Sequence, residues 1–246
     1  MKTIRQETLG KATLRLLQRK SDFAGIVILN NQIVQQTEGS DPNELWQRLC
    51  GLASESNPQY FGFDGARARF LRIFPKGFES TAYFERERGY KLEAKKVLDS
   101  AAPVEAALNG RGMGKAVLAT FQKSNLLDPR FELPRISDVL RSSSADAFIR
   151  TAAQFTIEMK QSSLSSMREI LAKHDAAKWT IASYLPFLWD PARHMFLKPQ
   201  VTQDFAERVG HPFRQEYQST LELSVYQSLL NLASHTEQEI SSLAGC

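Results

Sequence analysis

The sequence predicts an α+β protein that is mainly helical, in which an N-terminal three-stranded antiparallel β-meander and one helix precede a helical array. Two observations predict this fold class. Between residues 12 and 39, β-branched and aliphatic residues gather in short runs separated by polar reversals. Beyond residue 60, apolar residues instead recur at three- and four-residue spacing, between glycines and prolines that punctuate the chain.

The meander is predicted from three extended runs. Residues 13–18 and 25–29 are expected to pair across the polar residues 20–22. A second reversal at Asn30 and Asn31 leads into residues 32–37, because asparagine tolerates the positive φ that tight hairpin turns require. A sheet of three strands needs a helix on one face to be stable, so a helix is expected to follow.

That helix is expected to begin just after residue 40 and to end between residues 54 and 58. Ser40 or Asp41 can serve as its N-cap, and Pro42 suits the first turn. The apolar residues of the segment share one face, which predicts packing on the sheet; they are Leu45, Trp46, Leu49 and Leu52.

The rest of the chain is predicted to be helical. The expected helices span residues 63–74, 80–100, 103–108, 113–123, 136–141, 144–161, 163–174, 203–209 and parts of 212–243. Residues 179–189 are rich in large apolar groups and are interpreted as a core segment. Residues 195–198 are expected to be extended, with Thr202 as the N-cap of the next helix. We predict two regions, residues 1–58 and 59–246, packed as one continuous body.

Composition bounds the class of protein. The 246 residues are 42% hydrophobic and 24% charged, which is typical of a packed globular chain. The only cysteines, Cys50 and Cys246, give no disulfide framework and no metal-type pair. Charges interrupt the first 20 residues, which excludes a signal peptide there, and no run is long enough to span a bilayer. We therefore expect a soluble, cytoplasmic protein without a membrane partner.

A basic and aromatic stretch between residues 67 and 96 carries the strongest functional signal. It holds nine basic and four acidic residues, a local charge of +5, whereas the whole chain has a formal charge of +4. Aromatic residues are interleaved with these charges, as on surfaces that combine phosphate contacts with base stacking. The predicted nucleic-acid contacts are Arg67, Arg69, Arg72, Arg86, Arg88 and Lys91. The alternative is a solvated helix face on which glutamates and lysines pair at three- and four-residue spacing.

Two other stretches invite a catalytic or nucleotide-binding interpretation. Residues 110–115, Gly-Arg-Gly-Met-Gly-Lys, stand before a predicted helix, but their spacing is not that of a Walker loop, and an interhelical turn is favoured. Asp190, His194 and Lys198 could line a pocket between the meander and the helices, which makes an enzyme the second hypothesis. The competing interpretation is that His194 is a structural histidine.

Metal and cofactor sites are not predicted. The four histidines show no metal-binding spacing, and there is no nucleophile elbow. Glu93-Ala94-Lys95 with Asp64 resembles the Glu-x-Lys end of a nuclease metal site, but that site needs strands and this pattern is helical. Cys50 lies beside the apolar face of a predicted helix, so no catalytic nucleophile is predicted. Whether the protein is an enzyme stays open.

Several longer motifs occur along the chain: Tyr60-Phe-Gly-Phe-Asp-Gly-Ala-Arg67, Arg69-Phe-Leu71, Phe74-Pro-Lys-Gly-Phe78, Glu87-Arg-Gly-Tyr-Lys91, Leu185-Pro-Phe-Leu188, His194-Met-Phe-Leu-Lys-Pro199 and Val201-Thr202. Together they resemble a family of uncharacterised bacterial hypothetical proteins that has no established activity. The resemblance covers most of the chain and implies no catalytic residue. Members of the family continue beyond the position of Cys246 with an Ile-Asp-x-Gln-Ser-Phe-Ile-Trp-like segment, so we expect a truncated or divergent member.

Three functions therefore compete. The leading hypothesis is a nucleic-acid-associated protein that uses the basic and aromatic stretch. The second is the enzyme with a pocket between meander and helices. The third is a protein-interaction module of a multi-gene bacterial system, whose exposed aromatic residues meet a protein partner.

Overall fold

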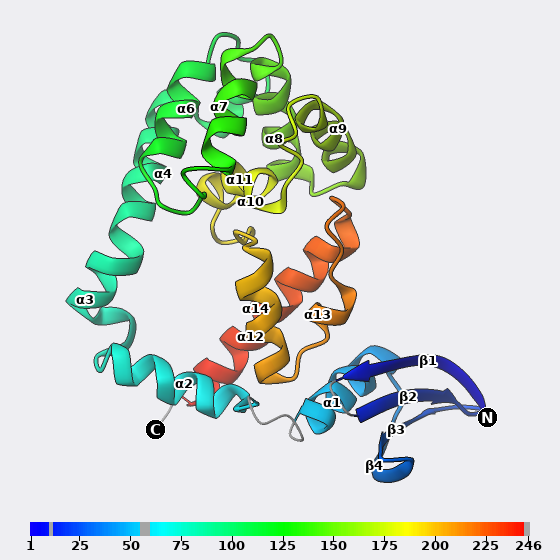
Figure 1. Ribbon diagram of the computed structural model, residues 1–246. Coiled ribbons are helices and arrows are strands. Elements are labelled where there is room, and N and C mark those ends of the chain that lie inside the picture. The colour runs from blue at the N-terminus through cyan, green and yellow to red at the C-terminus, as the bar shows by residue number, and fades with distance from the viewer. Residues whose placement is uncertain (10–11, 55–59, 244–246) are drawn as a thin grey trace. The chain divides into compact units, whose positions relative to one another are not determined.

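The structure is a computed structural model that describes residues 1–9, 12–54 and 60–243. It confirms a mainly helical α+β chain with an antiparallel sheet at the N-terminus (Figure 1). The chain divides into two compact units. The first unit comprises Met1–Ile73, Gln200–Tyr217 and Asn231–Cys246, and the second comprises Phe74–Pro199 and Gln218–Leu230. The predicted boundary between residues 58 and 59 lies outside the described ranges. That the two regions pack as one continuous body stays a prediction.

The sheet of the first unit has four antiparallel strands in sequence order, so the prediction of three strands is wrong in number. The strands are β1 (Lys2–Leu9), β2 (Ala12–Gln18), β3 (Phe23–Leu29) and β4 (Gln32–Gly39). β1 was missed because only Ile4 and Leu9 are apolar in it, whereas Lys2, Arg5 and Glu7 are charged, as is typical of an edge strand. The turn between β3 and β4 is confirmed, since Asn30 and Asn31 both have positive φ.

The helix α1 (Pro42–Ser54) covers one face of the sheet, as predicted. Of the two N-cap candidates, Asp41 is the cap, because its Oδ1 accepts hydrogen bonds from the backbone N–H groups of Asn43 and Glu44 at 2.7 and 2.9 Å. Gly25 on β3 lets α1 approach closely: a Cβ there would lie 2.6 Å from Cδ1 of Leu49. The absence of a side chain at this position therefore sets how tightly α1 packs on the sheet.

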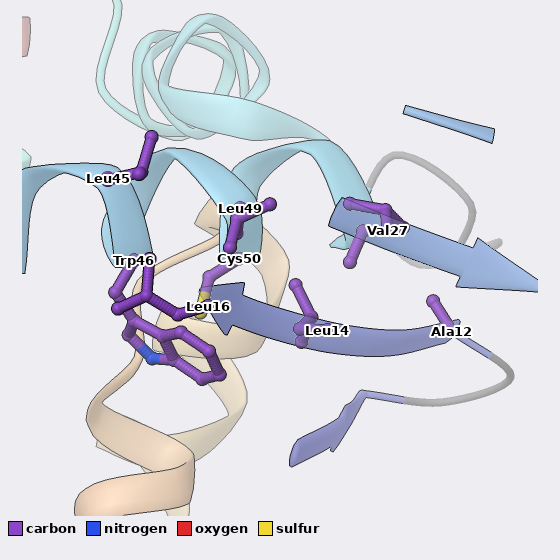
Figure 2. Close-up of a cluster of buried hydrophobic side chains, with 9 residues drawn as sticks. Ala12, Leu14, Leu16, Val27, Leu45, Trp46, Leu49 and Cys50 are labelled. Carbon is purple, nitrogen blue, oxygen red and sulfur yellow. The ribbon is translucent and has the colours of Figure 1, made fainter. Parts of the chain in front are cut away.

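The core of the first unit lies between α1 and the sheet. Figure 2 shows Trp46, Leu49 and Cys50 of α1 beside Leu14 and Leu16 of β2. The β2 side chains alternate between buried and half-buried, because successive residues of a strand point to opposite faces. The predicted apolar face of α1 is therefore confirmed, with Leu52 only partly buried at its edge.

The remaining helices of the first unit lie far apart in the sequence. They are α2 (Gly62–Ile73), α12 (Pro199–Val209), α13 (Phe213–Glu216) and the C-terminal part of α14 (Leu223–Leu243). The backbone N–H of Phe61 donates to the carbonyl oxygen of Arg208 at 3.0 Å, which joins the start of α2 to the end of α12. The predicted N-cap at Thr202 is wrong, because α12 already begins at Pro199, where proline suits the first helical position.

The second unit is a helical array, as predicted. Its elements are η1 (Gly77–Glu79), α3 (Thr81–Tyr83), η2 (Phe84–Arg88), α4 (Gly89–Ala101), α5 (Val104–Ala107), α6 (Gly114–Gln122), α7 (Glu132–Arg141), α8 (Ala145–Glu158), α9 (Gln161–Ala172), α10 (Trp179–Ala182), α11 (Tyr184–Trp189) and the start of α14. Helices α4, α6, α7, α8 and α9 pack in chain order (Figure 1). The predicted helix over residues 80–100 is interrupted by η2, a single π-helical turn.

The aromatic segment of residues 179–189 forms α10 and α11 and is buried, which confirms its interpretation as core. Its polar atoms are satisfied within the second unit. The indole N–H of Trp179 donates to the carbonyl oxygen of Gln218, and that of Trp189 donates to the carbonyl oxygen of Ala102, both at 2.9 Å. The hydroxyl of Tyr184 donates to the carbonyl oxygen of Thr120 at 2.9 Å. The extended segment predicted over residues 195–198 forms no strand.

Every helix in the part of the chain that the structure describes is too short or too polar to span a bilayer.

Candidate nucleic-acid interface

Three of the predicted contact residues lie on α2 in the first unit. Arg69 and Arg72 are exposed, whereas Arg67 is half-buried. With 3.6 residues per turn, Arg67 lies roughly 140–160° around the helix from Arg69 and Arg72. The guanidinium of Arg69 lies over the ring of Phe61, 4.2 Å from its centroid. α2 therefore presents Arg69 and Arg72 together and Arg67 separately.

The other three predicted contacts lie in the second unit, on η2 and the first turn of α4. Arg86 and Arg88 are exposed, and neither forms an ion pair with any described residue. Lys91 is half-buried and lies 3.7 Å from the carboxylate of Glu87, in the helical spacing that stabilises such pairs. The six predicted residues thus form two groups, one in each unit, and each group presents two exposed arginines without an ion pair to any described residue: Arg69 and Arg72 on α2, and Arg86 and Arg88 on η2.

Part of the basic stretch has the structural role that the alternative interpretation assigned to it. Glu87 pairs with Lys91, and Lys95 pairs with Asp99 at 3.0 Å, both four residues apart. Lys95 also donates to the carbonyl oxygens of Leu188 and Trp189 at 3.1 and 3.0 Å. Those carbonyls close α11, so Lys95 stabilises the C-terminal end of that helix. Lys95 is therefore a structural residue and not a free contact.

The same contacts weaken the metal-site interpretation of Glu93-Ala94-Lys95. These residues are helical, and Lys95 is held at the end of α11. Asp64 lies on α2, in the other unit. No cluster of three metal-ligating side chains occurs within the ranges that the structure describes.

Two exposed phenylalanines accompany the arginines of η2, and both belong to the aromatic residues that are interleaved with the basic stretch in the sequence. Phe78 is 55% exposed and Phe84 is 50% exposed. Tyr83 lies between them in the chain, and its ring meets that of Phe78 edge-on, with 5.2 Å between the centroids. A π-helical turn such as η2 is rare in proteins and occurs often at functional sites. Phe84 and two exposed arginines on this turn, with Phe78 in the preceding η1, make η1 to η2 the best-formed candidate interface.

The glycines of residues 110–115 have packing and turn roles. A Cβ at Gly114 would overlap the carbonyl oxygen of Leu140, so Gly114 is required where α6 packs against the end of α7. Gly112 has a φ of +71°, which glycine adopts freely, and its N–H donates to the Asp146 carboxylate at 2.9 Å. A hollow of about 240 Å³ lies beside these glycines. The geometry supports the interhelical turn that the spacing predicted.

The enzyme hypothesis expected Asp190 and His194 to act together in one pocket. In the structure their side chains form hydrogen bonds with different partners. Asp190 accepts a hydrogen bond from Nε of Arg193 at 2.6 Å, which lowers the pKa of its carboxyl group. His194 is buried, and both of its ring nitrogens are engaged. Nε2 donates to the carbonyl oxygen of Thr156 at 2.9 Å, and Nδ1 faces the Tyr226 hydroxyl at 3.1 Å. These contacts favour the structural interpretation of His194.

A second buried histidine, His211, has a similar role in the first unit. Its Nδ1 accepts the backbone N–H of Phe213 at 3.1 Å, which leaves Nε2 to donate to the side-chain oxygen of Asn231 at 2.8 Å. Asn231 also accepts a hydrogen bond from the amide of Gln47 at 2.7 Å. His211 therefore ties α14 to the segment before α13 in its neutral form.

Because His194 and His211 are both buried, we predict that the protein is less stable in mild acid. Burial lowers the pKa of His194 and of His211 below the ordinary value of 6.5. The unfolded chain then binds protons that the folded chain does not, so stability is present above pH 6.5 and is lost as the pH falls below it. We expect the urea concentration at the unfolding midpoint to decrease as the pH is lowered from about 7 to about 5.

The control for this pH dependence is a double variant, His194→Gln with His211→Gln. It should show a flatter pH profile, because glutamine does not titrate. A wild-type midpoint that is constant or rises as the pH falls over this window would contradict the prediction.

Cys50 is not available as a nucleophile. It is fully buried in the core of the first unit, and burial raises the pKa of its thiol to about 12. The thiolate that nucleophilic attack requires is therefore not formed near neutral pH.

Comparison of the chain with protein-family models, with curated proteins and with solved structures found no match. The resemblance to a bacterial family stays a prediction, and the site is interpreted from its own chemistry.

Proposed function

We propose that this is a cytoplasmic, nucleic-acid-associated protein in which the arginines of η2 contact phosphate groups. One observation carries the proposal: Arg86 and Arg88 are exposed and, among the described residues, unpaired, and the half-exposed Phe84 belongs to the same turn. A guanidinium stays charged at any physiological pH and donates two parallel hydrogen bonds to a phosphate. A surface of this kind suits a phosphate backbone.

The acidic residues of η2 do not cancel this charge. Glu85 and Glu87 are both exposed, but the carboxylate of Glu87 is bound to Lys91. Two arginines then remain on the turn against one carboxylate, that of Glu85, for which no ion pair forms among the described residues. Arg69 and Arg72 on α2 provide a second exposed basic pair, in the first unit, and the proposal assigns them a supporting role.

Salt-dependent binding tests this proposal. We expect a fluorescein-labelled oligonucleotide to bind at low salt and to dissociate as the salt concentration rises, because phosphate contacts release counterions. The double variant Arg86→Gln/Arg88→Gln should bind at least about tenfold more weakly in moderate salt, and the slope of log K against log salt should become shallower by about two. Fluorescence anisotropy titrations at several salt concentrations measure both quantities.

The matched control is Arg150→Gln/Lys173→Gln, which removes the same charge from exposed positions on and beside other helices of the second unit. This control should retain most of the affinity. Equal losses in both double variants would show that net charge and not η2 determines binding, and an absence of binding at low salt would overturn the proposed function.

A further inference from the structure

The two phenylalanines beside the arginines indicate which form of nucleic acid fits this surface. Large aromatic side chains normally bury most of their surface, yet Phe78 and Phe84 each leave about half of theirs open to solvent. They stand in η1 and η2, on either side of the short helix α3. Exposed aromatic rings that accompany exposed arginines form the kind of surface on which single-stranded nucleic acids stack.

Both rings contact neighbouring groups of the protein that hold them in place. A Cβ at Gly89 would lie 3.3 Å from Cε1 of Phe84, so the ring of Phe84 rests against the backbone at this glycine. Tyr83 supports Phe78 edge-on and in turn meets the ring of Phe74 edge-on, with 5.4 Å between the centroids of Tyr83 and Phe74. Phe74 is itself buried. A base that stacks here meets rings that are already held in place, so little side-chain entropy is lost on binding.

The π-helical turn also places an aromatic ring and a guanidinium group on the same side of the helix. The backbone N–H of Gly89 donates to the carbonyl oxygen of Phe84, which closes the wide turn. Phe84 and Arg88 are four residues apart on it and are therefore neighbours on one side of the helix. The ring of Phe84 can stack on one base, and the guanidinium of Arg88 can bind the adjoining phosphate, so the pair fits a single nucleotide of a strand.

We infer that this surface binds single-stranded nucleic acid in preference to duplex. The inference rests on the proposed function and deepens it. In a duplex the faces of the bases are covered by their neighbours in the stack, so Phe78 and Phe84 have no base face to meet. An unpaired strand offers those faces along with its phosphates.

Paired titrations with single-stranded and duplex probes test this inference. The probes are a fluorescein-labelled oligodeoxythymidine and a mixed-sequence DNA duplex of the same length. We expect the single strand to bind more tightly at equal salt. Phe84→Leu keeps the apolar bulk against Gly89 but removes the π face, and it should weaken single-strand binding about tenfold while duplex binding is unchanged. Arg86→Gln/Arg88→Gln should weaken both.

The matched control is Phe131→Leu, since Phe131 is the other strongly exposed phenylalanine of the second unit and also lies beside an arginine, Arg130. It should leave both affinities unchanged. Thermal unfolding must show that Phe84→Leu folds, and Phe84→Trp, which enlarges the stacking surface, should retain single-strand binding. Equal affinities for the two probes, or no effect of Phe84→Leu, overturn the inference and leave the proposed function standing. If neither probe binds at low salt, the proposed function fails, and the inference fails with it.

Discussion

Replacing Trp46 by alanine is expected to lower the free energy of unfolding by about 3–5 kcal/mol, the largest effect of any single change considered for this protein. The side chain is 1% exposed and fills the core between α1 and the sheet. The guanidinium of Arg5 lies over the indole, 4.1 Å from its centroid, and would lose that contact. Urea unfolding followed by far-UV circular dichroism measures the loss, and hydrogen exchange in β2 and α1 locates it.

Trp46→Phe is the matched variant and should be far milder. The indole nitrogen of Trp46 is buried without a hydrogen-bond partner among the described residues, so phenylalanine removes an unsatisfied donor while keeping most of the apolar volume. We expect the two variants to differ by at least about 2 kcal/mol. Similar losses for alanine and phenylalanine would show that the indole nitrogen has a partner, contrary to the structure.

Gly114→Ala is expected to destabilise the second unit by about 2 kcal/mol or more. The added methyl group would overlap the carbonyl oxygen of Leu140, a backbone atom that cannot rotate away. α6 would therefore have to move from the end of α7, although alanine is intrinsically a better helix former than glycine. The same urea titration measures this change.

Gly51→Ala provides the opposite expectation. Gly51 also lies in a helix, α1, but among the described residues a Cβ there would meet no atom within 4 Å beyond its chain neighbours and its own helix backbone. The substitution should stabilise the protein by about 0.5–1 kcal/mol, because alanine loses less backbone entropy on folding. Two glycine-to-alanine changes with opposite signs separate packing from propensity. A stabilising Gly114→Ala would show that α6 does not depend on this close approach.

Periodicity and caps predicted most of the fold because they are local. The turn at Asn30 and Asn31, the cap at Asp41 and the buried segment of residues 179–189 all follow from residue types within a few positions. β1 could not be recognised in this way. Its residues are mostly charged or polar, with only Ile4 and Leu9 apolar, and it becomes a strand because β2 offers a partner and because Arg5 pairs with Glu7 and Glu216 at 3.0 and 3.3 Å.

The site was predictable only in part, for a different reason. Sequence located the basic and aromatic stretch, but it could not distinguish Lys95, which is bound to the carbonyls of α11, from Arg88, which is exposed. That difference depends on Leu188 and Trp189, more than 90 residues away. Likewise, nothing in the composition of the helix shows which phenylalanines remain half-exposed. The exposed fractions of Phe78 and Phe84 are properties of the tertiary structure.

The wide turn at η2 has a consequence for how this segment tolerates changes in length. The five residues of this turn complete about the same rotation and rise as about four residues of a regular helix, so the extra residue is absorbed within the turn. Deleting one of residues 84–88 would therefore allow a regular helix in which the parts before and after the turn keep their relative orientation. The buried Ala94 and Leu98 of α4 would keep their contacts, and the change would be confined to the side chains that the turn presents. This segment can lose one position without disturbing the core, at the cost of the arrangement of Phe84 and the two arginines.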